Sequence, residues 1–186
     1  MPRPVALLDA NVLYPARLRD LLIRLAIAGL YQARWSEQIL DECFDNLIGD
    51  RPDLTQDQLA RTRRLMKIAL PDASVTGYED RLEEVDLPDP DDRHVVAAAM
   101  TAGVSLLVTA NLDDFPAARL PEGLRVMSPD EFVLALANDD LDVVVDVVDA
   151  QAAGLVNPPM TTNQLLDGLG EVGLVESVAL IRQAIS

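Results

Sequence analysis

The sequence contains one cysteine, one histidine and one lysine among its 186 residues, and these scarcities limit its chemistry. Cys43 alone cannot form an internal disulfide, so a reducing, cytoplasmic setting is expected. His94 alone leaves little material for nucleophilic catalysis built on histidine, and the chain carries no serine-elbow or Walker motif. No apolar run is long enough to span a bilayer, so no membrane partner is expected.

Acidic residues outnumber basic ones by 31 to 15, which gives a net charge of −16 and an isoelectric point near 4.2. Taken alone, this charge opposes nonspecific binding of nucleic acid. An acidic total is nevertheless compatible with a metal site, because clustered carboxylates repel one another unless a divalent cation lies among them. The chain is 49% hydrophobic, and its length suits one domain or one domain with an appendage.

Short apolar segments alternate with segments of helical spacing up to residue 137. The expected strands cover residues 5–8, 30–35, 72–75, 104–109 and 124–127. The expected helices cover residues 17–29, 36–48, 55–70, 92–102 and 128–137. This alternation is typical of a parallel sheet with helices on both faces. The sequence therefore predicts an α/β fold, a three-layer α/β/α sandwich around a central parallel sheet.

Helix starts are marked by Ser36 and by two capping boxes, Thr55–Gln58 and Ser128–Glu131. Gly103 is expected to end the helix over residues 92–102. Beyond residue 137 the pattern changes to three helical segments, 140–154, 161–170 and 174–185, with no strand between them. The predicted organisation is a domain over residues 1–137 followed by a helical C-terminal extension over residues 138–186. The extension could pack on the flank of the domain or serve a dimer or partner contact.

The stretch "LPDPDDRHVVAAAM", residues 87–100, places three aspartates directly before an apolar helix. The simplest interpretation is a helix cap by Asp91, with Asp92 in the first turn. A second interpretation is that Asp92 binds a cation. The two roles are compatible, since a helix N-terminus favours anions.

Other acidic side chains are expected near Asp92, because parallel sheets place ligand chemistry at the carboxyl ends of their strands. Asp9 follows the first strand, and the acids of the loop 110–115 follow the strand over residues 104–109. The expected helix over residues 36–48 also places an acid near this edge of the sheet. Helical periodicity does not decide whether that acid is Asp41 or Glu42.

Four segments resemble, in order and spacing, the PIN-domain proteins, the nuclease fold of VapC-type toxins. They are "LLDANVL" at 7–13, "ILDE" at 39–42, "DPDDRHVVAAA" at 89–99 and "LLVTANLDDF" at 106–115. Each segment alone is a weak signal, whereas four in order are fairly specific. The resemblance covers about residues 4–135 and leaves the C-terminal extension outside it.

The resemblance implies an endoribonuclease that hydrolyses RNA phosphodiester bonds with Mg²⁺ or Mn²⁺. It also implies the toxin component of a type II toxin–antitoxin system, with an antitoxin protein as partner and a homodimeric state. The residues carried over as metal ligands and catalytic groups are Asp9, Glu42, Asp92 and Asp114. Thr109 and Asn111 match polar positions that support such sites. Asn111 and Asp113 stay open as alternatives for the fourth ligand.

Three rival functions are compatible with parts of the pattern. A response-regulator receiver also gathers acids at strand ends, but it needs a lysine after a late strand, and Lys67 lies on a mid-chain helix. A PIN scaffold without catalysis would act only as a protein-interaction module. A DNA-directed nuclease of the same fold would need the same acids, so the sequence does not separate it from a ribonuclease.

Overall fold

The structure, a computed structural model, describes residues 3–185 and contains within them one sheet of five parallel strands. The strands are β1 (Val5–Leu8), β2 (Gln32–Ser36), β3 (Ser74–Val75), β4 (Leu106–Val108) and β5 (Arg125–Met127). Their spatial order is β3-β2-β1-β4-β5, so β1 lies at the centre. The side chains of Ala6, Leu7 and Leu8 are fully buried, as expected of a strand covered on both faces.

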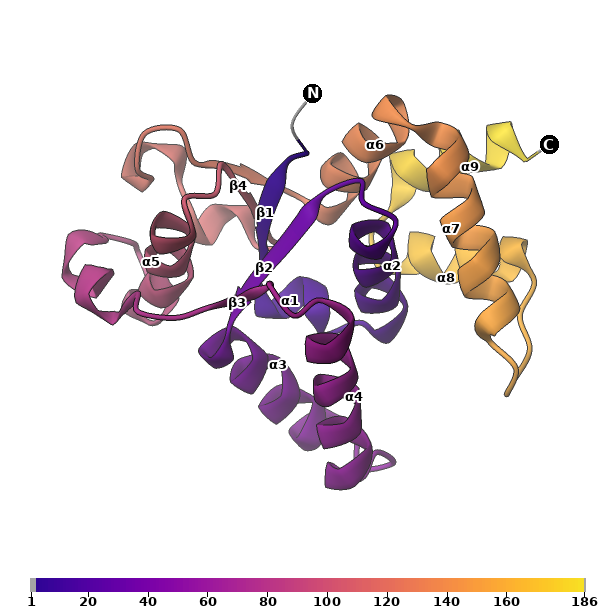
Figure 1. The fold of residues 1–186 in the computed structure, drawn as a ribbon, viewed down its shortest axis with the longest axis horizontal. Helices are drawn as coiled ribbons and strands as arrows, with labels where there is room; N and C mark the ends of the chain where they lie inside the picture. The colour runs from indigo at the N-terminus through magenta and orange to yellow at the C-terminus, as the bar shows by residue number, and fades with distance from the viewer. Residues whose placement is uncertain (1–2, 186) are drawn as a thin grey trace.

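Helices cover both faces of this sheet, which confirms the predicted α/β/α sandwich (Figure 1). In Figure 1, α5 (Arg93–Ala102) lies on one side, and α2 (Ala16–Ile27) and α6 (Pro129–Asp139) lie on the other. The carboxyl end of β1 leads to α1 (Ala10–Leu13) and that of β2 leads to α3 (Glu37–Asp50), which is followed by α4 (Gln56–Ala69). Short 3₁₀ helices cover Glu79–Glu84, Pro90–Asp92, Leu112–Asp114 and Ala117–Arg119.

Most of the predicted helix boundaries match the structure, and one predicted cap is wrong. Ser36 accepts a hydrogen bond from the amide of Ile39, and both predicted capping boxes form. Gly103 ends α5 with a φ of 62°, which glycine adopts readily. Within residues 3–185 the Asp91 side chain caps no helix. Instead, Asp89 accepts from the Asp91 amide at 2.9 Å and starts the 3₁₀ turn before α5. The cause is Pro90, which occupies the first position of that turn, two residues earlier than predicted.

The C-terminal region consists of α7 (Leu141–Gly154), α8 (Thr162–Glu171) and α9 (Val175–Ala184), as predicted. α7 and α8 pack against α2, and α9 packs against α6, on the flank of the sheet domain (Figure 1). Gln151 on α7 is buried and donates from Nε2 to the carbonyl of Arg17 at 3.0 Å. Asp130 on α6 accepts from the amides of Glu176 and Ser177, at 2.9 Å each, and so caps α9. The division of the chain at residue 137 stays a prediction.

None of the helices within residues 3–185 has the length and apolarity needed to cross a membrane.

Candidate active site

A cavity of about 470 Å³ opens at the carboxyl ends of the central strands. The four carboxylates singled out in the sequence all line it, although they come from four separate elements. Asp9 follows β1, Glu42 lies on α3, Asp92 precedes α5, and Asp114 ends the 3₁₀ turn after β4. The other lining residues are Ala10, Asn11, Tyr14, Asn46, Asp91 and Asn111. The fold therefore gathers side chains more than 100 positions apart around one opening.

Asp9 is the most constrained of the four carboxylates, with only 7% of its surface exposed. Its amide donates to the carbonyl of Val108 on β4, which ties the end of β1 to the neighbouring strand. Oδ1 accepts from the amide of Ala10 at 2.7 Å and so caps α1. Oδ2 accepts from Asn11 Nδ2 at 2.9 Å and from Thr109 Oγ1 at 2.8 Å. Burial raises the pKa of Asp9, and the bonds from Thr109 and Ala10 oppose that rise.

Asn11 and Thr109 form the polar support beneath Asp9. Asn11 Nδ2 also donates to Thr109 Oγ1 at 2.9 Å, while its Oδ1 accepts from the amide of Ala110 at 2.9 Å. The Asn111 amide donates to Thr109 Oγ1 at 3.1 Å. Thr109 was expected to have a supporting role, whereas the bridging role of Asn11 was not predicted. Its position two residues after Asp9, at the start of a helix, was the available signal.

The structure separates Asp41 from Glu42, which helical periodicity could not do. Asp41 turns toward α4 and forms an ion pair with Arg63, with 2.6 Å between Oδ1 and Nη1. Glu42 faces the cavity instead, and its Oε1 lies 2.8 Å from Nε2 of His94. Asn46, one helical turn after Glu42, lines the same cavity, and this spacing could have identified it from the sequence.

Burial and neighbouring charges both act on Asp92. Its pKa is raised to about 6, mainly by burial and then by the negative charges of Asp114 and Asp9. Asp114 faces this cavity, whereas Asp113, beside it, lines only an adjoining depression formed by residues 110–114. Asn111 borders both hollows. This placement favours Asp114 over Asp113 as the acid that would share a metal ion with Asp92.

The donor set of the cavity is suited to a hard divalent cation. Carboxylate and amide oxygens are the ligands that Mg²⁺ accepts, and Mg²⁺ keeps several of its waters. Burial is the main cause of the raised pKa of Asp92, and a bound cation would relieve the additional repulsion from Asp114 and Asp9. As the side chains stand in residues 3–185, no three His, Cys, Asp or Glu groups have the arrangement of a metal site. An ion would therefore have to draw the carboxylates together or reach some of them through water.

Positive charge is absent from the lining of this cavity, whose ten residues all lie in the described range. The basic side chains of α4 do not supply it, because Arg63 and Lys67 form ion pairs with Glu37 at 2.7 Å and 2.6 Å. The carboxylates of the cavity would therefore repel a polyanionic substrate unless cations were bound among them.

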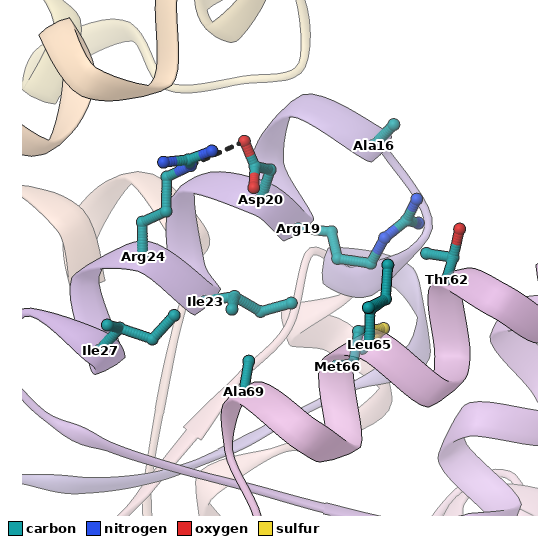
Figure 2. A pocket seen from close by; sticks show the side chains of 10 residues that line it. All are labelled: Ala16, Arg19, Asp20, Ile23, Arg24, Ile27, Thr62, Leu65, Met66 and Ala69. Carbon is teal, nitrogen blue, oxygen red and sulfur yellow. Dashed lines mark hydrogen bonds and ion pairs between the residues drawn. The ribbon is translucent and has the colours of Figure 1, made fainter. Parts of the chain in front are cut away.

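A second hollow, a groove of about 390 Å³, lies between α2 and α4 (Figure 2). Its lining is mainly apolar, and Ile27 and Leu65 are 59% and 51% exposed. Asp20 and Arg24 form an ion pair at 3.0 Å along α2, drawn as a dashed line in Figure 2. Asp20 is the sole carboxylate in this lining, so the groove lacks the clustered acids of the cavity at the strand ends.

Comparison with known proteins identifies the family of the chain. Residues 5–113 match the family model described as PIN domain, and residues 129–183 match the model of the VapC50 C-terminal domain. The chain is 40% identical over 85 residues to the Mycobacterium tuberculosis (strain ATCC 25618 / H37Rv) protein named "Putative ribonuclease VapC50". The match covers 43% of this chain and 48% of that protein, so the chain spans about half the length of the relative.

No solved structure matches the chain. The PIN-domain match covers more than half of the 186 residues and includes Asp9, Glu42 and Asp92, and it agrees with the parallel sheet and its order of elements. The chain therefore belongs to the PIN-domain family.

Proposed function

We propose that the protein is a metal-dependent endoribonuclease that hydrolyses RNA phosphodiester bonds. The observation that carries this proposal is the single cavity lined by Asp9, Glu42, Asp92 and Asp114 at the carboxyl ends of the strands. These four carboxylates would hold one or two Mg²⁺ or Mn²⁺ ions. The similarity to a protein named as a ribonuclease favours RNA as the substrate.

A bound divalent ion would supply charge for the scissile phosphate and a water of lowered pKa. The protein's own contribution is to hold the carboxylates in place. Asp9 is fixed by Asn11 and Thr109, and the short helix α1 keeps its carboxylate at the end of β1. Asp92 and Asp114 line the same cavity, and the charge of Asp114 adds to the effect of burial in raising the pKa of Asp92.

We also infer a biological role as the toxin component of a type II toxin–antitoxin system. The support is the match to the VapC50 C-terminal domain beside the PIN domain. The expected partners are an antitoxin protein that masks the acidic cavity and a second copy of the chain. Co-purification of the protein with the product of a small neighbouring reading frame would support this role. Loss of cell growth on expression, reversed by that product, would support it further.

Cleavage of total RNA tests the proposed activity. The wild-type protein should degrade RNA in the presence of Mg²⁺ or Mn²⁺, and the cleavage should stop when EDTA removes the metal ion. Asp114→Asn should lose about a hundredfold in rate, because one charge at the site is removed. Asp113→Asn, the adjacent acid outside this cavity, is the matched control and should keep its activity. Equal loss in both variants would contradict the assignment.

Two rival functions predict different results in the same assay. A non-catalytic PIN scaffold would leave RNA intact and bind neither Mg²⁺ nor Mn²⁺ in calorimetry. A DNA-directed nuclease would cleave single- or double-stranded DNA faster than RNA of the same sequence. The proposed ribonuclease should show the reverse preference.

A further inference from the structure

The single histidine of the sequence is buried against one of the four cavity carboxylates. His94 is 3% exposed and lies on α5, two residues after Asp92. Its Nε2 lies 2.8 Å from Oε1 of Glu42, whose side chain is 40% exposed. The contact joins α5, which directly follows Asp92, to α3, which carries Glu42. We propose that His94 is a positioning residue, which holds the Glu42 carboxylate in the orientation needed to bind the metal ion.

The length of the contact suits a ring that presents an Nε2 proton to the Glu42 carboxylate. A nitrogen and an oxygen that both presented lone pairs would repel at 2.8 Å, whereas this is an ordinary length for N–H···O. The N–H is not well aligned with the oxygen, and neither ring nitrogen has a well-directed hydrogen bond within residues 3–185. A small rotation of the carboxylate would align the pair, as expected of a site that tightens when its ligand binds.

The interactions of Glu42 are confined to one of its two oxygens. Besides His94, Gln38 Nε2 lies 3.5 Å from the same Oε1, and Tyr78 donates to Gln38 Oε1 at 3.4 Å. Among the described residues, no hydrogen bond or ion pair engages Oε2. A carboxylate held by one oxygen presents the other to the cavity in a fixed direction. Supporting contacts of this kind orient ligands around metal ions in proteins.

Stability alone does not explain a histidine at this position. Nδ1 is buried without a partner in the described part of the chain, and an unsatisfied buried polar atom costs free energy. An apolar side chain of similar size would remove that cost, because its neighbours on α5, Val95 and Val96, are also buried. The histidine is therefore better explained by its contact with Glu42 than by packing.

The inference rests on the proposed metal site, and its test reads metal affinity rather than cleavage. Titration calorimetry with Mn²⁺ compares wild type, His94→Leu and His94→Gln, each at the same pH. His94→Leu should bind Mn²⁺ about tenfold more weakly or worse, while its melting temperature stays equal or rises. His94→Gln should keep most of the affinity, because its amide nitrogen reaches the place of Nε2. Gln151→Leu, a buried amide on α7, is the control and should leave Mn²⁺ affinity unchanged.

A double variant tests whether His94 acts through Glu42. In a Glu42→Gln background, His94→Leu should weaken Mn²⁺ binding no further, since the carboxylate that it positions is gone. If His94→Leu fails to fold, His94→Asn replaces it, because the shorter amide reaches only the place of Nδ1. His94→Asn should then bind Mn²⁺ weakly and His94→Gln well.

Three results would overturn the inference: Mn²⁺ affinity of His94→Leu within about twofold of wild type, equal weakening in His94→Gln, or full additivity with Glu42→Gln. Failure of the proposed function looks different. A wild-type protein that binds no Mn²⁺ would refute the metal site itself, and the role of His94 with it.

Discussion

Replacing Thr109 by valine should lower both the free energy of unfolding of the protein and the affinity of its metal site. Thr109 is fully buried, and its hydroxyl donates to Asp9 Oδ2 at 2.8 Å while accepting from Asn11 and from the amide of Asn111. Valine keeps the shape and removes all three contacts. A hydrogen bond to a charged group contributes about 1.5–3 kcal/mol, whereas the exposed Asn111 can turn to water. We expect a loss of about 2 kcal/mol, or about 4–8 °C in melting temperature.

The pH dependence of this loss identifies its cause. The Thr109 bond favours the ionised form of Asp9, so its removal raises the pKa of Asp9 further. The destabilisation should be full at neutral pH, where the carboxylate is charged, and shrink as acid protonates Asp9. Mn²⁺ affinity, which needs the carboxylate, should fall at a higher pH in Thr109→Val than in wild type.

Thr101→Val provides the matched control for this substitution. The hydroxyl of Thr101 on α5 is buried and has no hydrogen-bond partner in the described structure, so its loss should be neutral or stabilising. Thermal melts at pH 5 and pH 7.5 and Mn²⁺ calorimetry compare the two variants. Equal effects of Thr109→Val and Thr101→Val on both readouts would refute the role given to Thr109.

Two further predictions concern Asp92 and Asp130. The pKa of Asp92 is about 6 without metal, so below that pH binding must displace a proton, and Mn²⁺ affinity should fall about tenfold per pH unit. Calorimetry from pH 5 to pH 8 measures this, and an affinity flat below pH 6 would contradict it. Asp130→Ala removes the cap of α9 and should cost about 0.5–2 kcal/mol in thermal unfolding, with Mn²⁺ affinity unchanged. A large loss of metal affinity in this variant would mean that the C-terminal helices shape the cavity.

Much of the fold could be predicted from the sequence, because its signals are local. Ser36 and the capping boxes mark where helices begin, and Gly103 marks where α5 ends, because each of these signals acts within one helical turn. The run Val5–Leu8 reads as a buried strand without knowledge of its neighbours. The predicted cap before α5 was wrong for an equally local reason. Pro90 takes the first position of the 3₁₀ turn, so Asp89 and not Asp91 is the capping residue.

The candidate site was less predictable, because its geometry depends on contacts between distant residues. Helical periodicity does not distinguish Asp41 from Glu42, whereas the packing of α3 places Asp41 in an ion pair with Arg63 on α4 and Glu42 in the cavity lining. The contact of His94 with Glu42 likewise depends on how α5 and α3 pack. Asp9, by contrast, was identifiable because a charged residue directly after a buried strand has few structural explanations.

The most direct test of a metal site shared by the four carboxylates is a crystal structure of the protein grown with Mn²⁺, in which anomalous scattering locates the metal. We expect an anomalous peak in the cavity, coordinated by carboxylate oxygens of Asp9 and at least two of Glu42, Asp92 and Asp114. A Mn²⁺-saturated crystal with no peak in that cavity, or with the four carboxylates each bound only to water or protein, would contradict a common metal centre.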